Sequence, residues 1–270
     1  MKEYDFYIVP TPIGNLGDIT VRAIDTLKSV DLIACEDSRV TQKLLNHFGI
    51  KTKCISYHKF NEKERTAKLL EIIQSGKKAA LVSDAGTPLF CDPGSILAEE
   101  LRSRSVKITA LPGANAAATF LSQIARKNED FYFAGFMPRT KDQTENLITK
   151  FKHTDLVFYE SPNRILKTLK TVKDCRPNSR AAIGRELTKF FEEIKIGGIS
   201  EITGFCEENP PKGEITGLIF READSGCDLI EEKIAALKSK NFKAKEISVI
   251  ISELYNISRN EVYKAVIENE

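Results

Sequence analysis

The sequence lacks the residue patterns of a metal site and of a membrane span, and neither sign of charge is in clear excess. Its six cysteines, at positions 35, 54, 91, 175, 206 and 227, form no CxxC pair, and its three histidines follow no ligand spacing, so no metal site is expected. No apolar run reaches the roughly 18 residues of a membrane-spanning helix. The 40 Lys and Arg residues nearly balance the 38 Asp and Glu residues. A polyanionic partner would therefore have to meet a local basic patch.

Motifs for phosphate-bearing cofactors and for hydrolysis are also missing. Neither GxGxxG nor GxxxxGK[ST] occurs, which disfavours a nicotinamide cofactor or a nucleoside triphosphate. There is no GxSxG and no paired Cys/His nucleophile, so a hydrolase is unsupported. Scattered single cysteines suit a reducing compartment, and the opening MKEYDFYIV does not have the pattern of a signal peptide. We expect a cytoplasmic protein.

The first half of the chain alternates short apolar runs with helix-period segments. The runs at 5–9, 30–34, 54–57, 78–83 and 106–111 predict strands. Helical segments of about 10–15 residues between strands favour crossover units and a mainly parallel sheet. In such a sheet the loops that follow the strands lie along one edge. Asp92 followed by Pro93 predicts the start of a helix that continues to residue 104.

The second half predicts a different sheet and a helical tail. Strands are expected at 131–135, 155–159, 181–186, 190–196 and 214–220, and the short separations of the last ones indicate antiparallel pairing. Helices are expected at 229–237, 244–255 and 259–267. The predicted organisation is an N-terminal α/β domain (1–115), a second α/β domain (116–222) and a helix-turn-helix-like extension (223–270). Its last helix carries only Arg259 and Lys264 as cations, so a helical hairpin that packs on the body or on a partner chain stays an equal alternative.

Four loops rich in glycine and proline follow predicted strands. They are PTPIGNLGD (10–18), SDAGTP (83–88), LPGAN (111–115) and YESPNR (159–164). Glycine lets the backbone approach a ligand closely, and proline lowers the entropy cost of holding the loop shape. We expect all four at one sheet edge, where α/β sheets bind ligands, around a polar ligand without phosphate. Taken singly, each of these loops is better explained as an ordinary tight strand-to-helix turn.

Together with five further motifs these loops resemble the tetrapyrrole methylase family. The motifs run in order through residues 5–220: IVPTPIGNLGD (8–18), CEDSR (35–39), LVSDAGTP (81–88), DPG (92–94), LPGANA (111–116), FMPR (136–139), FYESPNR (158–164), GRELTK (184–189) and KGEITGL (212–218). The resemblance implies S-adenosylmethionine held between two α/β domains, a homodimer, and no metal for the methyl transfer. The long first loop and the helical tail are similar to the group that methylates a cytidine ribose 2′-hydroxyl in 16S ribosomal RNA.

The resemblance directs attention to particular residues. Asp84 would accept a hydrogen bond from the cofactor, or would instead cap the next segment. The full set expected at the cofactor is Pro10, Asp84, Ala85, Gly86, Leu111, Pro112, Ala114, Tyr159, Leu187 and Ile215. Candidate general bases for a hydroxyl nucleophile are Asp18, Glu36, Asp37, Glu160 and Glu186. Cations beside the loops that would hold RNA phosphates are Arg39, Arg139, Arg164, Arg185 and Lys189, and aromatics that would stack a base are Phe136, Tyr159 and Phe190.

Two other functions remain open from the sequence. A methylase of this fold could act on a tetrapyrrole or another small molecule, although the tail and the cationic loop edges disfavour this. A non-catalytic nucleic-acid-binding protein would use the tail, but it would leave the four rigid loops unexplained. We therefore expect 16S ribosomal RNA or the small ribosomal subunit as the partner, without a membrane.

Overall fold

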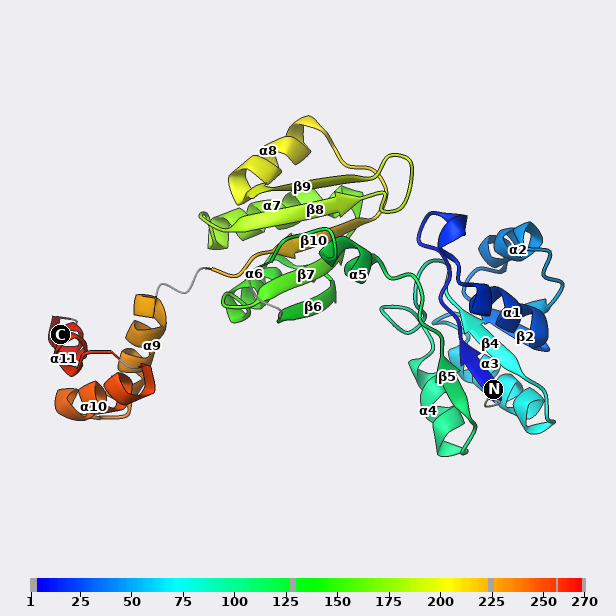
Figure 1. Ribbon diagram of the computed structural model, residues 1–270, viewed down its shortest axis with the longest axis horizontal. Coiled ribbons are helices and arrows are strands. Elements are labelled where there is room, and N and C mark those ends of the chain that lie inside the picture. Colours follow the sequence, from blue (N-terminus) through cyan, green and yellow to red (C-terminus); the bar gives the residue numbers. More distant parts are fainter. Residues whose placement is uncertain (1–3, 127–129, 223–225, 256, 269–270) are drawn as a thin grey trace. The chain divides into compact units, whose positions relative to one another are not determined.

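The computed structural model describes residues 4–126, 130–222, 226–255 and 257–268. The chain forms two compact units, residues 1–220 and residues 221–270 (Figure 1). Within the described ranges, no helix combines the length and the apolar character needed to cross a membrane.

The first sheet consists of five parallel strands in the order β3-β2-β4-β1-β5. Its strands are β1 (Phe6–Ile8), β2 (Leu32–Cys35), β3 (Lys53–Ser56), β4 (Ala79–Val82) and β5 (Ile108–Ala110). The connecting helices are α1 (Val21–Ser29), α2 (Ser38–His47), α3 (Glu62–Gln74) and α4 (Ser95–Ser103), with a short 3-10 helix, η1 (Leu16–Asp18). The predicted strands and their parallel pairing are confirmed.

Helices cover both faces of this sheet. Leu27 of α1 and Leu45 of α2 pack in one buried cluster, and Leu69 of α3 and Leu97 of α4 pack in the other. The central strands β2 and β4 are buried along their whole length, which is why they read as continuous apolar runs. Neighbouring strands β1 and β4 continue into helices on opposite faces. Their loops therefore open a crevice, and ligands bind at this position in open α/β sheets.

The predicted helix start at Asp92 is wrong. The helix α4 begins at Ser95, and its N-cap is Gly94, whose φ of 129° is disfavoured for other residues. An added Cβ at Gly94 would lie 2.7 Å from the Leu81 side chain, so the close approach also requires glycine. Asp92 is instead left in the loop before the helix, where its side chain reaches Ser83.

The second sheet is mixed, with the order β6-β7-β10-β8-β9. Its strands are β6 (Phe131–Phe136), β7 (Asp155–Glu160), β8 (Arg180–Arg185), β9 (Glu193–Gly198) and β10 (Ile215–Ile219). The pair β6–β7 is parallel and the other three pairs are antiparallel, as the short connections predict. Because β7 belongs to this sheet, the expectation that all four glycine- and proline-rich loops share one sheet edge is wrong: three follow the first sheet and the fourth follows the second.

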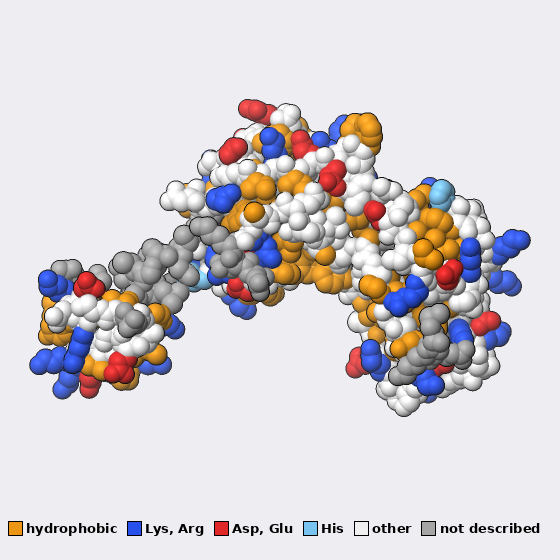
Figure 2. All heavy atoms as spheres, in the orientation of Figure 1, with side chains coloured by type: hydrophobic (Ala, Val, Ile, Leu, Met, Phe, Trp, Pro, Cys, Tyr) orange, Lys and Arg blue, Asp and Glu red, His pale blue; other side chains and the backbone are white. Residues whose placement is uncertain are grey.

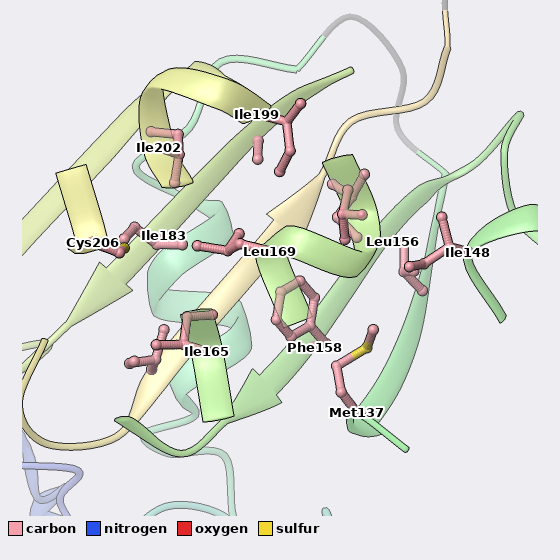
Figure 3. Packing of buried hydrophobic residues seen from close by; sticks show 14 residues of the cluster. Met137, Ile148, Leu156, Phe158, Ile165, Leu169, Ile183, Ile199, Ile202 and Cys206 are labelled. Carbon is pink, nitrogen blue, oxygen red and sulfur yellow. The ribbon is translucent and has the colours of Figure 1, made fainter. Parts of the chain in front are cut away.

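Helices also cover the second sheet. The helices are α5 (Ala116–Leu121), α6 (Lys141–Lys150), α7 (Pro162–Cys175) and α8 (Ile199–Glu208). Figure 3 shows Phe158 of β7 and Leu169 of α7 among the side chains that fill the core under α6, α7 and α8. Phe120 of α5 is fully buried in the cluster on the other face. The predicted α/β fold class is confirmed.

The second unit is helical. It contains α9 (Gly226–Ser239), α10 (Ala244–Tyr255) and α11 (Arg259–Glu268), and it has a small apolar core of its own around Ile247, Ile251 and Val266. The helical extension is thus present. The division of residues 1–222 into two separate domains at 115/116 stays a prediction.

Candidate active site

A cavity of about 620 Å³ lies where the loops after β1 and β4 meet residues of the second sheet. This volume is within the ~300–1,000 Å³ range of small-molecule sites. Its lining from the first sheet is Ile13, Glu36, Asp84, Ala85, Gly86, Thr87, Phe90, Cys91, Asp92, Asn115 and Ala116. Its lining from the second sheet is Phe136, Tyr159, Glu160, Glu186, Leu187, Lys189, Gly213, Glu214, Ile215 and Thr216.

The loop after β4 holds the neighbouring loops in place by hydrogen bonds. Thr11 and Gly86 exchange two backbone hydrogen bonds of 2.9 Å, which joins this loop to the loop after β1. The Thr87 hydroxyl donates to the Ala114 carbonyl over 2.9 Å, which joins it to the loop after β5. The Asp84 carboxylate accepts from the Asp37 backbone N–H, at the start of α2. Three neighbouring loops are therefore tied to the loop after β4, and the wall that the four loops form is rigid.

Four of the ten residues expected at the cofactor do not line the cavity. Pro10, Leu111, Pro112 and Ala114 lie behind the lining, whereas Asp84, Ala85, Gly86, Tyr159, Leu187 and Ile215 are on it. The loops that carry these four residues approach each other closely: a Cβ added at Gly113 would lie 2.5 Å from Pro10 Cβ. Asn115 and Ala116, which follow Gly113 closely in the chain, do line the cavity.

The second sheet contributes the opposite wall. The Tyr159 hydroxyl accepts a hydrogen bond of 3.1 Å from the backbone N–H of Ala117, in the first turn of α5. Burial raises the pKa of Tyr159 to about 12, so this phenol is neutral. The rings of Phe90 and Phe133 are stacked with their centroids 4.7 Å apart, which joins the loop after β4 of the first sheet to strand β6 of the second.

Backbone strain gathers at this cavity. Six non-glycine residues of the described chain have a left-handed φ, and four of them are Leu89, Cys91, Glu186 and Thr188. Cys91 and Glu186 line the cavity themselves. Each such conformation costs about 1–3 kcal/mol and persists only where the surrounding contacts enforce it. This concentration is typical of a functional site.

Three carboxylates from the first sheet share the cavity, and the pKa of each is raised. Burial, followed by the charges of Asp84 and Asp92, raises the pKa of Glu36. Burial is also the main cause of the raised pKa of Asp84. The pKa of Asp92 is raised to about 6, chiefly by burial and then by the charges of Asp84 and Glu214. A base works best when its pKa is near the working pH, so Asp92 is well suited to accept a proton.

The other predicted bases have different surroundings. Asp18 is exposed on η1, outside the lining. Asp37 caps α2 and forms an ion pair of 2.6 Å with Arg39, which lowers the pKa of Asp37 to about 2. Glu186 lines the cavity and accepts from the Lys189 ammonium at 2.9 Å.

Glu160 lies at the cavity, but both of its carboxylate oxygens already have partners within the protein. Its side chain is inaccessible to solvent, and it accepts from the Ser161 N–H and the Thr168 hydroxyl, both at 2.8 Å. The Arg164 guanidinium lies 3.1 Å from its second oxygen and also donates to the carbonyls of Met137 and Pro138. These contacts describe a buried structural ion pair that anchors the loop after β6.

The predicted RNA-binding cations differ in whether a carboxylate already pairs with them. Arg39 pairs with Asp37 and Arg185 pairs with Glu193, while Arg164, whose side chain is 32% exposed, pairs with Glu160. Lys189 is the only Lys or Arg among the described residues of the lining. Arg139 is exposed at a second, smaller hollow before α6.

Sequence reasoning missed Asp92 and Cys91 as lining residues. Asp92 was assigned to a helix cap because Asp-Pro is a strong local signal for a helix start. The DPG motif (92–94) was the available signal, since it repeats the glycine-rich pattern of the other loops. Within the described residues, no three His, Cys, Asp or Glu side chains are placed to hold a metal ion.

Comparison with known proteins places this arrangement in a family. Residues 5–203 match the family described as Tetrapyrrole (Corrin/Porphyrin) Methylases. The chain is 42% identical to a Vibrio cholerae protein named Ribosomal RNA small subunit methyltransferase I, over 97% of this chain and 94% of the relative. It is 38% identical to the Bacillus subtilis protein of the same name, over 96% of this chain and 92% of that one.

Solved structures share the fold at low sequence identity. A diphthine synthase matches with a TM-score of 0.66 at 14% identity, covering 81% of this chain and 90% of that one. A cobalt precorrin-4 methyltransferase matches with a TM-score of 0.62 at 15% identity, covering 80% of this chain and 94% of that one. With the family match extending over most of the first unit, the chain belongs to the tetrapyrrole methylase family.

Proposed function

We propose that this protein transfers the methyl group of S-adenosylmethionine to the ribose 2′-hydroxyl of a cytidine in 16S ribosomal RNA. We infer the substrate from the similarity to relatives named Ribosomal RNA small subunit methyltransferase I. This similarity extends over 96–97% of the chain and includes the helical unit. A homodimer in the cytoplasm, acting on the RNA or on the small subunit, belongs to the same proposal.

The chemistry of the cavity fits a cationic donor. S-adenosylmethionine has a positively charged sulfur and an ammonium group. The lining offers the carboxylates of Glu36, Asp84, Asp92, Glu186 and Glu214, and the described lining has only Lys189 as a cation, which is neutralised by Glu186. Opposite charges in a partly desolvated site attract more strongly than in water. The backbone of the loop after β4 adds polar groups for the uncharged parts of the donor.

When bound, S-adenosylmethionine supplies a methyl group on an electrophilic sulfonium. The residues of this chain then have two tasks: to align the ribose oxygen and to remove its proton. Alignment is worth an effective molarity of up to ~10⁵–10⁸ M, and the hydrogen-bonded loops around Gly86 supply the rigidity it requires. A positioned base adds about 10²–10⁴-fold.

We assign the proton acceptor to Asp92. Its pKa of about 6 leaves it ionised at neutral pH yet basic enough to help, and its charge acts on residues of both sheets, Asp84 and Tyr159. Glu36, whose pKa is also raised, is the alternative. Asp37 is too acidic, and the carboxylate of Glu160 is fully engaged by its partners.

The rim offers contacts for a nucleotide. Phe190 is 94% exposed and follows Lys189 directly, and Phe136 of the lining is 56% exposed. RNA-binding proteins stack splayed bases on such rings. Arg139 is the predicted cation best placed to contact phosphates, because the other four are paired with carboxylates.

A competition among acceptors tests the proposal. Purified protein is given S-adenosylmethionine with a labelled methyl group, together with small ribosomal subunits, deproteinised 16S RNA or a tetrapyrrole. Label in ribose-methylated cytidine of either RNA sample supports the proposal and identifies the preferred form. Label in the tetrapyrrole alone contradicts it.

A further inference from the structure

The turn that joins α9 to α10 displays an unusual surface. Lys240, Lys243 and Lys245 are exposed, and Phe242 stands among them with 41% of its surface exposed. None of these three lysines forms an ion pair with a described residue. We call Lys240, Phe242, Lys243 and Lys245 the basic turn.

The backbone of the basic turn is held in one conformation. The N–H of Phe242 donates to the Leu237 carbonyl and the N–H of Asn241 donates to the Lys238 carbonyl, which is the hydrogen-bond pattern of a Schellman motif. Asn241 has the left-handed φ of 63° that this motif requires. The backbone that carries the three lysines is therefore ordered before any ligand binds. A ligand would bind without the entropy cost of ordering the loop.

Local electrostatics do not favour this arrangement in the absence of a partner. Lys243 and Lys245 lie at the N-terminal end of α10, where the helix dipole is positive and cations are disfavoured. Glu246 is the one acidic residue in the first turn of α10, and its carboxylate is engaged by the Lys243 backbone N–H at 2.8 Å. An anion in front of this turn would be attracted by the lysines and by the helix terminus together.

The last helix is a poorer candidate for the same role. The exposed residues of α11 include Glu261 beside Arg259 and Lys264, so its charges are mixed. Figure 2 shows Lys and Arg side chains on the visible face of the helical unit. In a helix-turn-helix reading α11 would be the recognition helix, yet the uncompensated charge lies on the turn before α10.

We propose that the basic turn binds single-stranded RNA, with the three lysines on successive phosphates and Phe242 stacked on a base. The inference rests on the proposed function, and it identifies the part of the helical unit that holds the substrate RNA. Positive grooves combined with aromatic platforms are how proteins bind single strands. An acidic membrane would need a broad apolar face, whereas Phe242 is the one exposed large apolar residue of the turn.

Binding of the full chain to a labelled single-stranded fragment of 16S RNA, measured by fluorescence anisotropy at several salt concentrations, tests this. The variant with Lys240→Ala, Lys243→Ala and Lys245→Ala is expected to bind at least about tenfold more weakly at low salt. Its log Kd against log salt slope should fall by about 2, because each phosphate contact contributes ~0.7. Phe242→Ala should weaken binding about tenfold and leave the slope unchanged. The matched control, Arg259→Ala with Lys264→Ala on α11, should bind as the unmodified protein does.

Two readouts separate this inference from the proposed function. Loss of RNA affinity in the lysine variant supports the basic turn even if the unmodified protein methylates no ribosomal RNA. Unchanged affinity and slope in that variant overturn it, even if methylation of small subunits proceeds. Lysine-dependent binding to phosphatidylserine vesicles, without binding to RNA, also overturns it. Calorimetric binding of S-adenosylmethionine should be equal in all variants, which confirms that the first unit is folded, and an unchanged helical circular dichroism spectrum confirms that the second unit is folded.

Discussion

The Asp84 carboxylate accepts a hydrogen bond from the backbone N–H of Asp37, with 2.9 Å from Oδ1 to N. The bond ties the loop after β4 to the start of α2, and Asp37 in turn caps that helix through the Arg39 N–H. Asp84 thus supports a neighbouring loop, rather than capping a segment of its own, and it also lines the cavity. Its expected hydrogen bond to the cofactor stays a prediction.

This geometry predicts different results for two substitutions of Asp84. Asp84→Asn keeps an acceptor for the Asp37 N–H but loses the charge, so it should weaken S-adenosylmethionine binding about tenfold or more with little loss of stability. Asp84→Ala removes both and should also lower the melting temperature. Titration calorimetry and thermal unfolding measure the two effects. Unchanged donor binding by both variants would remove Asp84 from the donor site.

The assignment of Asp92 predicts a particular pH profile. With its pKa raised to about 6, the carboxyl becomes protonated as the pH falls through that value, so kcat should drop about tenfold per pH unit below it. Asp92→Asn should lower kcat by about 10²-fold or more and abolish this acidic limb. The comparison is Glu36→Gln, which should keep the limb. The opposite result, with the limb lost only in Glu36→Gln, would transfer the role to Glu36.

Glu160 is predicted to act in stability. Glu160→Ala leaves Arg164, Thr168 and the Ser161 N–H without their buried acceptor, and breaking such a pair costs about 3 kcal/mol. Urea unfolding measures the change. Glu207→Ala is the matched control, because its ion pair with Lys170 is about half exposed and is worth less than about 1 kcal/mol. Equal losses in the two variants would refute the structural role of Glu160.

The contact between Gly113 and Pro10 predicts a steric effect. A methyl group at Gly113 would lie 2.5 Å from the Pro10 ring, so Gly113→Ala should lower the free energy of unfolding by about 2 kcal/mol. Gly204→Ala is the control: its Cβ meets no atom within 4 Å, and alanine favours the helix α8. Urea unfolding measures the free energy of unfolding of both variants. A Gly113→Ala protein as stable as the unmodified protein would contradict the contact.

Much of the fold could be predicted from the sequence because the patterns are local. Buried strands such as β4 appear as apolar runs, and alternation with helices implies parallel pairing. Which sheet a strand joins is not a local property, so the loop at Tyr159 was assigned to the edge of the first sheet. Asp92 was misassigned because the local cap signal before Pro93 was overridden by Gly94, whose close contact with Leu81 depends on the tertiary fold.

The candidate site was only partly predictable for a related reason. Residues of the glycine-rich loops, such as Asp84, could be found from the sequence because these loops follow strands directly. The sequence could not show that the buried carboxylate of Glu160 pairs with Arg164, or that Pro10 lies against Gly113. The basic turn was overlooked because attention fell on the charges of the last helix, whereas the lysines precede α10.

Mass spectrometry of 16S ribosomal RNA nucleosides from cells with and without this protein tests the central claim most directly. The account predicts one ribose-methylated cytidine that disappears when the protein is absent. It should return with the unmodified protein and stay absent, or nearly so, with Asp92→Asn. An identical nucleoside profile in the presence and absence of the protein would contradict the account.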